Sequence, residues 1–315
     1  MTDAPLTIVT REQGNNRALR TGEVRPERAA LQFVDVPVLV HAFRRMVRNL
    51  EFDVCEMALT TYLCAREHGV PFTALPVFLV RGFHHGAITH DRSSPVAHPK
   101  DLAGARVGVN RGYTVTTGVW ARGVLQDEHG VDPDGVTWVL SGDEHVAQYR
   151  PPPNVVPMPE GAALDELLLA EELAALIGVS SDDQRIAPLI EDADEAGYAA
   201  LRRTGHYPIN HLIVVKDDVL AARPGLAEEL FAAFAEAKQR YVTQLRDGTI
   251  AHPTATDRMY RRVMDITGGD PLPYGIAPNA AVLEELIGHA VRQRILTERA
   301  DLESLFAAGT RELVG

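Results

Sequence analysis

Cysteine is scarce in this chain, which limits what its thiols can do. Of the 315 residues only Cys55 and Cys64 are cysteines, and no CxxC pair occurs. Two thiols without metal-type spacing favour small buried residues in a reducing compartment over a disulfide framework.

Targeting signals and excess positive charge are also lacking. No apolar run approaches the ~18 residues of a membrane span. The first residues, MTDAPLTIVTREQG, have neither the basic nor the apolar region of a secretory signal. The formal net charge of -12 argues against nucleic acid as the main partner. We therefore expect a cytoplasmic protein that binds neither membranes nor nucleic acids.

Short β-branched runs alternate with longer helical patterns along most of the chain. This alternation predicts an α/β fold with mostly parallel sheets flanked by helices. From Pro224 onward the pattern is mostly helical. Expected strands are LTIVT (6–10), LQFVDV (31–36), FTALPVFLV (72–80) and GVTWVL (135–140), and expected helices include 114–129, 162–176 and a segment that ends at Gly69.

Two strand signals, Phe72–Ile88 and Ile209–Val215, flank a block with its own β-α-β-α pattern. A chain that leaves one lobe, builds a second and then returns gives this arrangement. We expect lobe 1 to comprise residues 1–88 and 207–315, and lobe 2 to comprise residues 89–206. The ligand cleft is expected between the lobes, where strand ends converge.

The segment RGFHHGAITH places one arginine and three histidines at the exit of an apolar strand. Such groups are costly to bury unless they face a cleft. Arg81 suits a bidentate carboxylate clamp, and His84 and His85 suit proton transfer near neutral pH. The alternative is a solvated loop in which Arg81 pairs with a structural acid.

The segment GVNRGYTVTTGVW has the form of a strand, a glycine-containing loop and a helix start. Thr114 and Thr116 offer hydroxyls and free backbone N–H groups, which suit a carboxylate, and Arg111 adds positive charge. In SGDEHVA, Glu144 and His145 are candidates for a base or a metal ligand. The alternative is that Asp143 simply caps a following turn.

Several segments, from about residue 50 to 215, resemble the 4,5-dihydroxyphthalate decarboxylase family, which is similar to type II periplasmic solute-binding proteins. The chain departs from the expected family pattern at three places. Thr10-Arg11-Glu12 stands where an aspartate–arginine pair is expected, Cys55 replaces a serine, and Asn210 replaces a methionine. The matching segments are EFDVCEMALTTYL, PFTALPVFLVRGFHHGAI, PKDLAGARVGV, YTVTTGVWARGVLQDEHGVDPDGVTWV, GDEHV and YPINHLIVV.

This resemblance implies a two-lobed, type II periplasmic-binding-protein-like fold and a carboxy-lyase. The expected substrate is a small hydroxylated aromatic carboxylate, and decarboxylation by acid/base protonation needs no organic cofactor in principle. Arg11 and Glu56 are expected to contact substrate, because such lobes bind ligands after the first strand and at the EFDVCEM junction. His211, at a strand end in YPINHLIVV, joins the catalytic candidates; the alternative is a satisfied core histidine.

Two other functions, a metal site and the packing of the C-terminal third remain open at this point. The chain can be a solute-binding protein for a carboxylate, or a different lyase on the same scaffold, similar to the chorismate dehydratase of menaquinone synthesis. His84, His85, His145, His211 and Glu144 can also hold a divalent metal, but no HxxxH or HxH spacing supports this and we predict no metal. The helical C-terminal third either packs on lobe 1 or forms a homo-oligomer.

Overall fold

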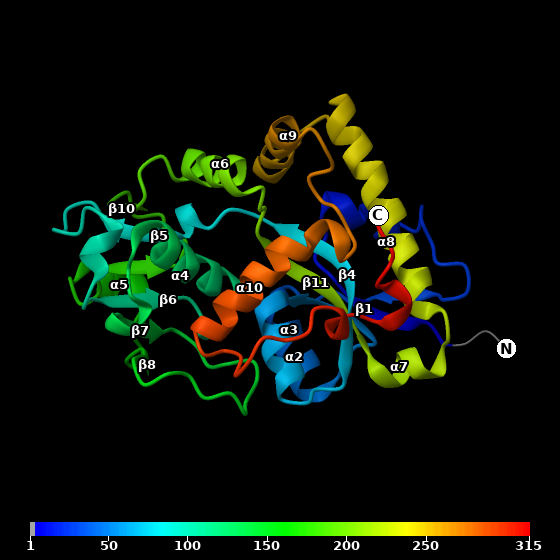
Figure 1. Cartoon of the computed structure of the whole chain (residues 1–315), viewed down its shortest axis with the longest axis horizontal. Helices are drawn as coiled ribbons and strands as arrows, with labels where there is room; N and C mark the ends of the chain where they lie inside the picture. The colour runs from blue at the N-terminus through cyan, green and yellow to red at the C-terminus, as the bar shows by residue number, and fades with distance from the viewer. Residues whose placement is uncertain (1–3) are drawn as a thin grey trace. The chain divides into compact units, whose positions relative to one another are not determined.

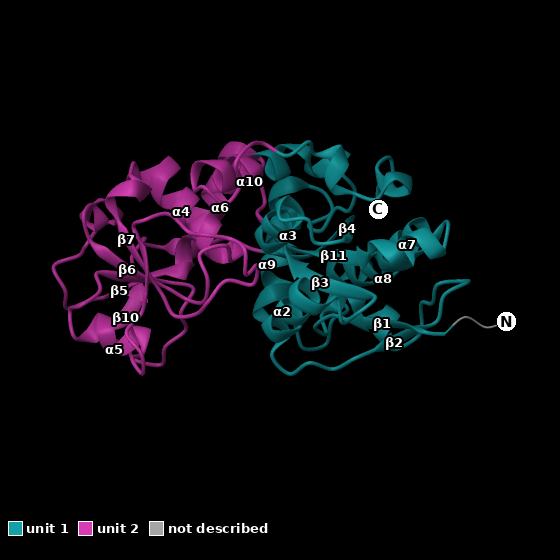
Figure 2. Cartoon of the chain, turned by 90° about the horizontal axis from the view of Figure 1, so that it is seen from below, with its two compact units in different colours: residues 1–81, 209–284, 300–315 teal, residues 82–208, 285–299 magenta. Residues whose placement is uncertain are grey.

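A computed structural model describes residues 4–315. The chain forms two compact units, shown in Figure 2. Unit 2 consists of Gly82–Pro208 and Glu285–Arg299, and the remainder of the described chain forms unit 1. The chain first crosses after Arg81, seven residues before the expected boundary, and returns at Ile209, two residues after the expected one, and Glu285–Arg299 belongs to unit 2 and not to the first lobe.

Unit 1 is built on a five-stranded mixed sheet with the order β2-β1-β3-β11-β4. β1 is parallel to both β2 and β3, whereas β11 is antiparallel to β3 and to β4. The long strands β4 and β11 run side by side (Figure 1). The strands are β1 (Leu6–Val9), β2 (Leu31–Phe33), β3 (Val54–Ala58), β4 (Phe72–Arg81) and β11 (Ile209–Lys216).

The stretch before Gly69 contains both a strand and a helix. Its first half forms β3, in which all five residues are buried, and only Leu59–Glu67 forms helix α3. A short, mainly apolar run does not by itself separate a central strand from a buried helix. Gly69, with φ +76°, follows the helix in the left-handed conformation that glycine adopts without strain.

The outer edge of β4 is covered by other parts of unit 1. The backbone N–H of Ala307 donates to Ala74 O, and that of Gly275 donates to Pro76 O. The side-chain amide of Asn15 donates to Leu79 O. These contacts occupy carbonyls that an open sheet edge would present to another chain.

The helices of unit 1 use ordinary capping and amphipathic patterns. In α2 (Leu39–Asn49) the buried residues recur at helical spacing and include Ala42, Phe43 and Met46. Thr254 and Asp257 form a reciprocal capping box at the start of α9. The other helices are α1 (Arg17–Arg20), α7 (Asp217–Ala222), α8 (Leu226–Asp247) and α9 (Ala255–Thr267), with short 3-10 turns at Gly14–Asn16, Ala277–Asn279, Glu303–Leu305 and Ala308–Thr310.

Unit 2 contains a six-stranded mixed sheet with the order β10-β5-β9-β6-β7-β8. β9, β6, β7 and β8 are parallel neighbours, and β5 is antiparallel to β9 and β10. The proline-rich segment 149–161 contains β8. The strands are β5 (Ile88–Asp91), β6 (Arg106–Val109), β7 (Thr137–Leu140), β8 (Val155–Pro157), β9 (Ala175–Ile177) and β10 (Ile186–Pro188).

Four helices accompany this sheet. The helix expected at 162–176 is shorter, because α5 ends at Leu169 and β9 begins at Ala175. Helix α10 begins in unit 1 and ends in unit 2. Within residues 4–315, no helix is long and apolar enough to cross a membrane. The helices are α4 (Thr116–His129), α5 (Leu164–Leu169), α6 (Ala193–Thr204) and α10 (Ala280–Arg292), with 3-10 turns at His85–Ala87, Pro99–Leu102 and Pro133–Gly135.

Candidate functional site

Three predicted site residues lie at one edge of the unit 1 sheet. Arg11 follows the carboxyl end of β1, Glu56 lies in β3, and His211 lies near the start of β11. Because β1 is parallel to β3 and β11 is antiparallel to it, these positions meet at the same edge. The carboxyl ends of parallel strands are where α/β sheets usually bind ligands.

Glu56 and His211 form a direct pair. Nδ1 of His211 lies 2.6 Å from Oε1 of Glu56. The register pairs His211 with Ala58 and Ile213 with Glu56, so the two side chains are diagonal neighbours on one sheet face. An ionised carboxylate only accepts, so Nδ1 carries the proton of this bond and Nε2 is left to give or take a proton.

The two side chains differ in how far they are buried. The Glu56 side chain is 0% exposed, whereas that of His211 is 13% exposed. The Phe43 ring meets the imidazole edge-on, with centroids 5.2 Å apart. The carboxylate and the phenyl ring therefore fix the imidazole from inside the protein while part of it reaches the surface.

Arg11 completes this group from the loop after β1. Its backbone N–H donates to Oε2 of Glu56 at 2.9 Å, and its Nε lies 3.7 Å from Oε1. The arginine side chain is 48% exposed, so about half of it remains accessible to an anion. We call Arg11, Glu56 and His211 the unit 1 site.

Arg81 lies at the end of β4 but is engaged inside unit 1. It is buried, and its Nη2 donates to Pro273 O at 3.0 Å and to Oδ1 of Asn279. Asn279 in turn donates to Pro273 O and Gly275 O. These contacts hold the segment before α10 against β4. The role of Arg81 as a substrate clamp stays a prediction.

The neighbouring histidines, His84 and His85, face different partners in unit 2. The His84 ring stacks on Trp120 with centroids 6.3 Å apart. Nε2 of His85 lies 3.3 Å from the carboxylate of Glu128, and this hydrogen bond holds the pKa of Glu128 below its usual range. Both histidines are buried, so the solvated-loop alternative is wrong for them.

Thr114 and Glu144, predicted separately, bind each other at the carboxyl edge of the unit 2 sheet. Oε2 of Glu144 accepts from Oγ1 of Thr114 at 2.6 Å and from its backbone N–H at 3.2 Å. Oε1 accepts from the backbone N–H of Tyr113. We call these three donors the loop cradle. The position where a substrate carboxylate was predicted therefore holds a carboxylate of the chain itself.

The remaining predicted residues surround this loop. Arg111 has φ +71°, and its backbone N–H donates to Oγ of Ser141 at 2.8 Å. Thr116 begins α4 and His145 follows Glu144; both are buried. Glu128, the partner of His85, lies near the other end of α4, roughly 18 Å from Thr116 at ~1.5 Å per residue. The predicted unit 2 residues thus form separate groups.

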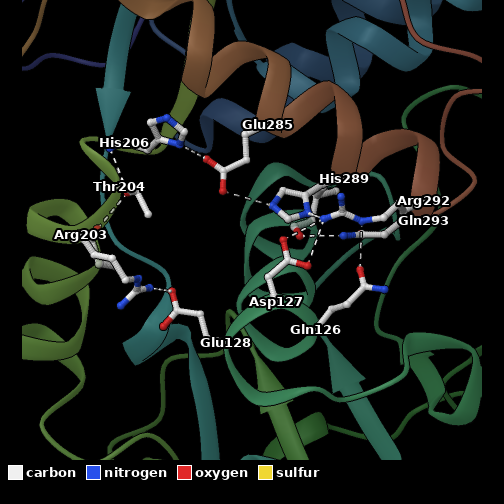
Figure 3. Close-up of polar contacts among 12 residues, drawn as sticks. Gln126, Asp127, Glu128, Arg203, Thr204, His206, Glu285, His289, Arg292 and Gln293 are labelled. Carbon is white, nitrogen blue, oxygen red and sulfur yellow. Dashed lines mark hydrogen bonds and ion pairs between the residues drawn. The ribbon is translucent and has the colours of Figure 1, made fainter.

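Sequence reasoning missed a polar network between α4 and α10 (Figure 3). Nδ1 of His206 lies 2.6 Å from Glu285, and Arg292 donates to Nδ1 of His289 at 2.8 Å and to Asp127 at 2.9 Å. Burial, reinforced by the Arg292 charge, lowers the pKa of His289 to about 4. The only sequence signal was the cluster of polar residues on an otherwise apolar C-terminal helix.

A fully buried arginine was also missed. Nε of Arg122 donates to Gln293 at 2.8 Å, and its Nη2 donates to Tyr113 O at 2.7 Å. Its guanidinium carbon lies 3.8 Å from the centre of the Tyr113 ring. A charged residue on the apolar face beside Trp120 and Leu125 was the available signal.

The same histidines do not form a metal site in the described residues. In the part of the chain that the structure describes, no three His, Cys, Asp or Glu side chains are grouped so that they can hold a metal ion. His211 and His85 each lie against a glutamate instead. The absence of a cofactor stays a prediction.

No protein-family profile matches the chain. Among curated proteins it is similar to a 4,5-dihydroxyphthalate decarboxylase from Comamonas testosteroni, with 28% identity over 287 residues that cover 86% of each chain. A protein of the same name from Pseudomonas putida is 34% identical over 144 residues, which are 43% of this chain and 55% of the relative. These similarities confirm the resemblance that the motifs predicted.

Solved structures share the fold across nearly the whole chain. A Candida albicans protein, CA3427, described as having the generic periplasmic binding protein fold, matches with a TM-score of 0.57 and 13% identity over 99% of this chain and 98% of that one. The alkanesulfonate-binding protein SsuA from Xanthomonas axonopodis pv. citri gives 0.53 and 13% over 98% and 99%. The desulfurization enzyme DSZB gives 0.53 and 16% over 96% of both chains. The chain therefore has the periplasmic-binding-protein-like fold that was predicted.

Proposed function

We propose that this protein is a carboxy-lyase that removes CO2 from a hydroxylated aromatic carboxylate of the 4,5-dihydroxyphthalate type. The observation that carries the proposal is the imidazole of His211, held at Nδ1 by the buried carboxylate of Glu56. The relatives named 4,5-dihydroxyphthalate decarboxylase support the reaction class. The fold alone would not, because unrelated functions share it.

The reaction exchanges a carboxylate for a proton on the ring. A ring hydroxyl para to the reacting carbon pushes electron density toward that carbon, which takes a proton and becomes tetrahedral. The bond to the carboxylate then breaks, its electron pair restores the aromatic ring, and CO2 leaves. No electron acceptor is consumed, which is why we propose a reaction without an organic cofactor.

Each residue of the unit 1 site has a defined role in this scheme. Nε2 of His211 delivers the proton to the ring carbon, because Nδ1 is occupied by Glu56. Glu56 is a positioning residue that fixes the tautomer and stabilises the imidazolium. Arg11 binds a substrate carboxylate through its exposed guanidinium. The catalytic roles expected from the sequence stay predictions for His84, His85, His145 and Glu144.

The test is release of CO2 from 4,5-dihydroxyphthalate by the purified protein and by His211→Asn. We expect kcat to fall by about 10²–10⁴-fold, the usual contribution of a general acid, with little change in the affinity for phthalate. His252→Asn, an exposed histidine, is the matched control. Full activity of His211→Asn would exclude this role. Release that persists with a chelator supports metal-independent chemistry.

A solute-binding protein is the second candidate, because SsuA shares the fold. In that case 4,5-dihydroxyphthalate or phthalate would raise the melting temperature while no CO2 formed. The same assay therefore separates the two functions.

We further propose a cytoplasmic location. Cys55 and Cys64 are both free thiols and both buried, as expected in a reducing compartment. Fractionation of the native host, with an antibody against the chain, tests this.

A further inference from the structure

We infer that Asn16 is a positioning residue of the unit 1 site. Its side chain sets the backbone of Arg11, and thereby both the direction of the Arg11 guanidinium and the support that Glu56 receives. The inference deepens the proposed function and rests on it, because it concerns how that site holds its substrate. Asn16 acts through other residues and does not touch the substrate itself, since it is 0% exposed.

The side chain of Asn16 binds the loop after β1 at three points. Its Nδ2 donates to Arg11 O at 2.8 Å and to Oγ1 of Thr10 at 3.2 Å. Its Oδ1 accepts from the backbone N–H of Gln13 at 3.0 Å. A side-chain amide that binds backbone groups in this way takes the place of regular secondary structure and fixes the loop between its partners.

Both backbone polar groups of Arg11 are occupied. Its N–H donates to Oε2 of Glu56 at 2.9 Å, and its carbonyl accepts from Asn16. The carbonyl before it, Thr10 O, accepts from Nη1 of Arg20 at 2.9 Å. A backbone held on both sides of a Cα atom fixes the direction of the Cβ atom and restricts the side-chain rotamers. The exposed guanidinium therefore extends from a fixed base.

The 3-10 turn that carries Asn16 is itself anchored to two other elements. A Cβ atom added at Gly14 would overlap the ring of Tyr241, so α8 lies directly against the turn. Nδ2 of Asn15 donates to Leu79 O at 2.9 Å, which ties the turn to β4. The turn is therefore a fixed support, and Asn16 carries its position to the loop after β1.

The amide group is required because Asn16 both donates and accepts. An aspartate has the same shape but presents a second acceptor oxygen to Arg11 O, and two acceptors repel each other. The loop must then move, and the N–H of Arg11 leaves the carboxylate of Glu56. A displacement of about 1 Å far from the reacting atoms can cost about 10²-fold in rate.

The experiment measures the dissociation constant for phthalate, by calorimetry, and kcat for CO2 release. Asn16→Asp is expected to raise Kd about 5–10-fold and to lower kcat about 10-fold. On an Arg11→Ala background the same change should alter Kd by less than about twofold, because the guanidinium that it positions is gone. Asn154→Asp is the matched control and should leave both constants unchanged, since Nδ2 of Asn154 also binds two backbone carbonyls, those of Pro133 and Val136.

A third measurement does not depend on a substrate. Exchange of the Arg11 amide hydrogen, followed by NMR, should be at least about 10-fold faster in Asn16→Asp, while exchange in β3 stays the same. Asn16→Ser, which adds no charge and is too short to bind all three groups, serves if the aspartate variant does not fold.

Unchanged exchange at Arg11 would overturn the inference, as would an equal loss of phthalate affinity with and without the Arg11 side chain. If the unaltered protein released no CO2, the proposed function would fail. Amide exchange would still decide whether Asn16 positions Arg11, so the two failures are distinguishable.

Discussion

Each unit places a glutamate near the ends of its parallel strands, and the two carboxylates are used in opposite ways. Glu56 lies within a strand, is fully buried and holds His211 so that Nε2 stays available. Glu144 lies on an irregular segment and accepts from the loop cradle. The carboxylate on the strand therefore supports another side chain, whereas the carboxylate on the irregular segment binds the backbone of a loop.

The units also differ in how they bury ionisable groups. Unit 1 pairs Glu56 with His211 and Arg11, and pairs the fully buried Lys238 with Asp270. Unit 2 also pairs the buried His85 with Glu128, but it keeps His289 in its neutral form, because burial and Arg292 lower its pKa. This difference predicts that acid affects the two units unequally.

The largest expected effect comes from Glu56→Gln. The carboxamide cannot stabilise the imidazolium and can support the wrong tautomer, so kcat should fall by about 10²-fold or more while KM changes little. Steady-state CO2 release measures both constants. Glu51→Gln, which alters only an exposed pair with Arg45, is the control. An unchanged kcat would show that Glu56 does not support His211 in catalysis.

Acid should destabilise unit 2. Because the pKa of His289 is lowered to about 4, the unfolded state binds the extra proton between about pH 6.5 and 4. The contribution of neutral His289 to the free energy of unfolding is therefore complete above pH 6.5. It falls by on the order of 3 kcal/mol as the pH drops to about 4. Both tryptophans, Trp120 and Trp138, lie in unit 2, so tryptophan fluorescence during urea unfolding reports on this unit. His289→Leu should flatten the pH dependence of the unfolding free energy. An unchanged slope in this variant would contradict the prediction.

Gly123→Ala should destabilise unit 2 at neutral pH. A Cβ atom at this position would overlap the imidazole of His289, which packs edge-on against Trp120. We expect a loss of about 1–3 kcal/mol in unfolding free energy, read by the same fluorescence. At Gly135 an added Cβ meets nothing within 4 Å, so Gly135→Ala is the control. Equal stability of the two variants would argue against tight packing here.

The smallest effect is expected for Arg11→Lys. A lysine keeps the charge but cannot bind a carboxylate through two parallel N–H groups, so KM should rise about 3–10-fold with kcat retained. Arg106→Lys, exposed at the start of β6, is the control. A fall in kcat without a change in KM would instead place Arg11 in the chemical step.

Sequence patterns predicted the positions of the candidate residues of the unit 1 site on its strands, but not which side chains they contact. LTIVT and LIVV marked strand ends beside Arg11 and His211, and both side chains lie at the same sheet edge. The pairing of His211 with Glu56 joins residues 155 positions apart. It depends on β11 lying between β3 and β4, which no local pattern specifies.

Other contacts could not be predicted from the sequence, because they depend on the length of α4 or on the unit to which α10 belongs. His85 contacts Glu128 near the end of α4, whereas Thr114 lies just before its start, so the two predicted residues do not meet. The last part of α10 belongs to unit 2 because Arg292 and Gln293 bind α4. The sequence shows that helix only as a continuation of the C-terminal helical region.

The position of β11 has a consequence for synthesis on the ribosome. β3 and β4 are not neighbours in the sheet; each pairs with β11, which is made roughly 130 residues after β4, or ~6–25 s later at ~5–20 residues per second. Until then one side of each strand is unpaired, and the contact of Ala307 with β4 comes later still. The nascent chain therefore exposes strand edges for much of translation, when chaperone protection matters most.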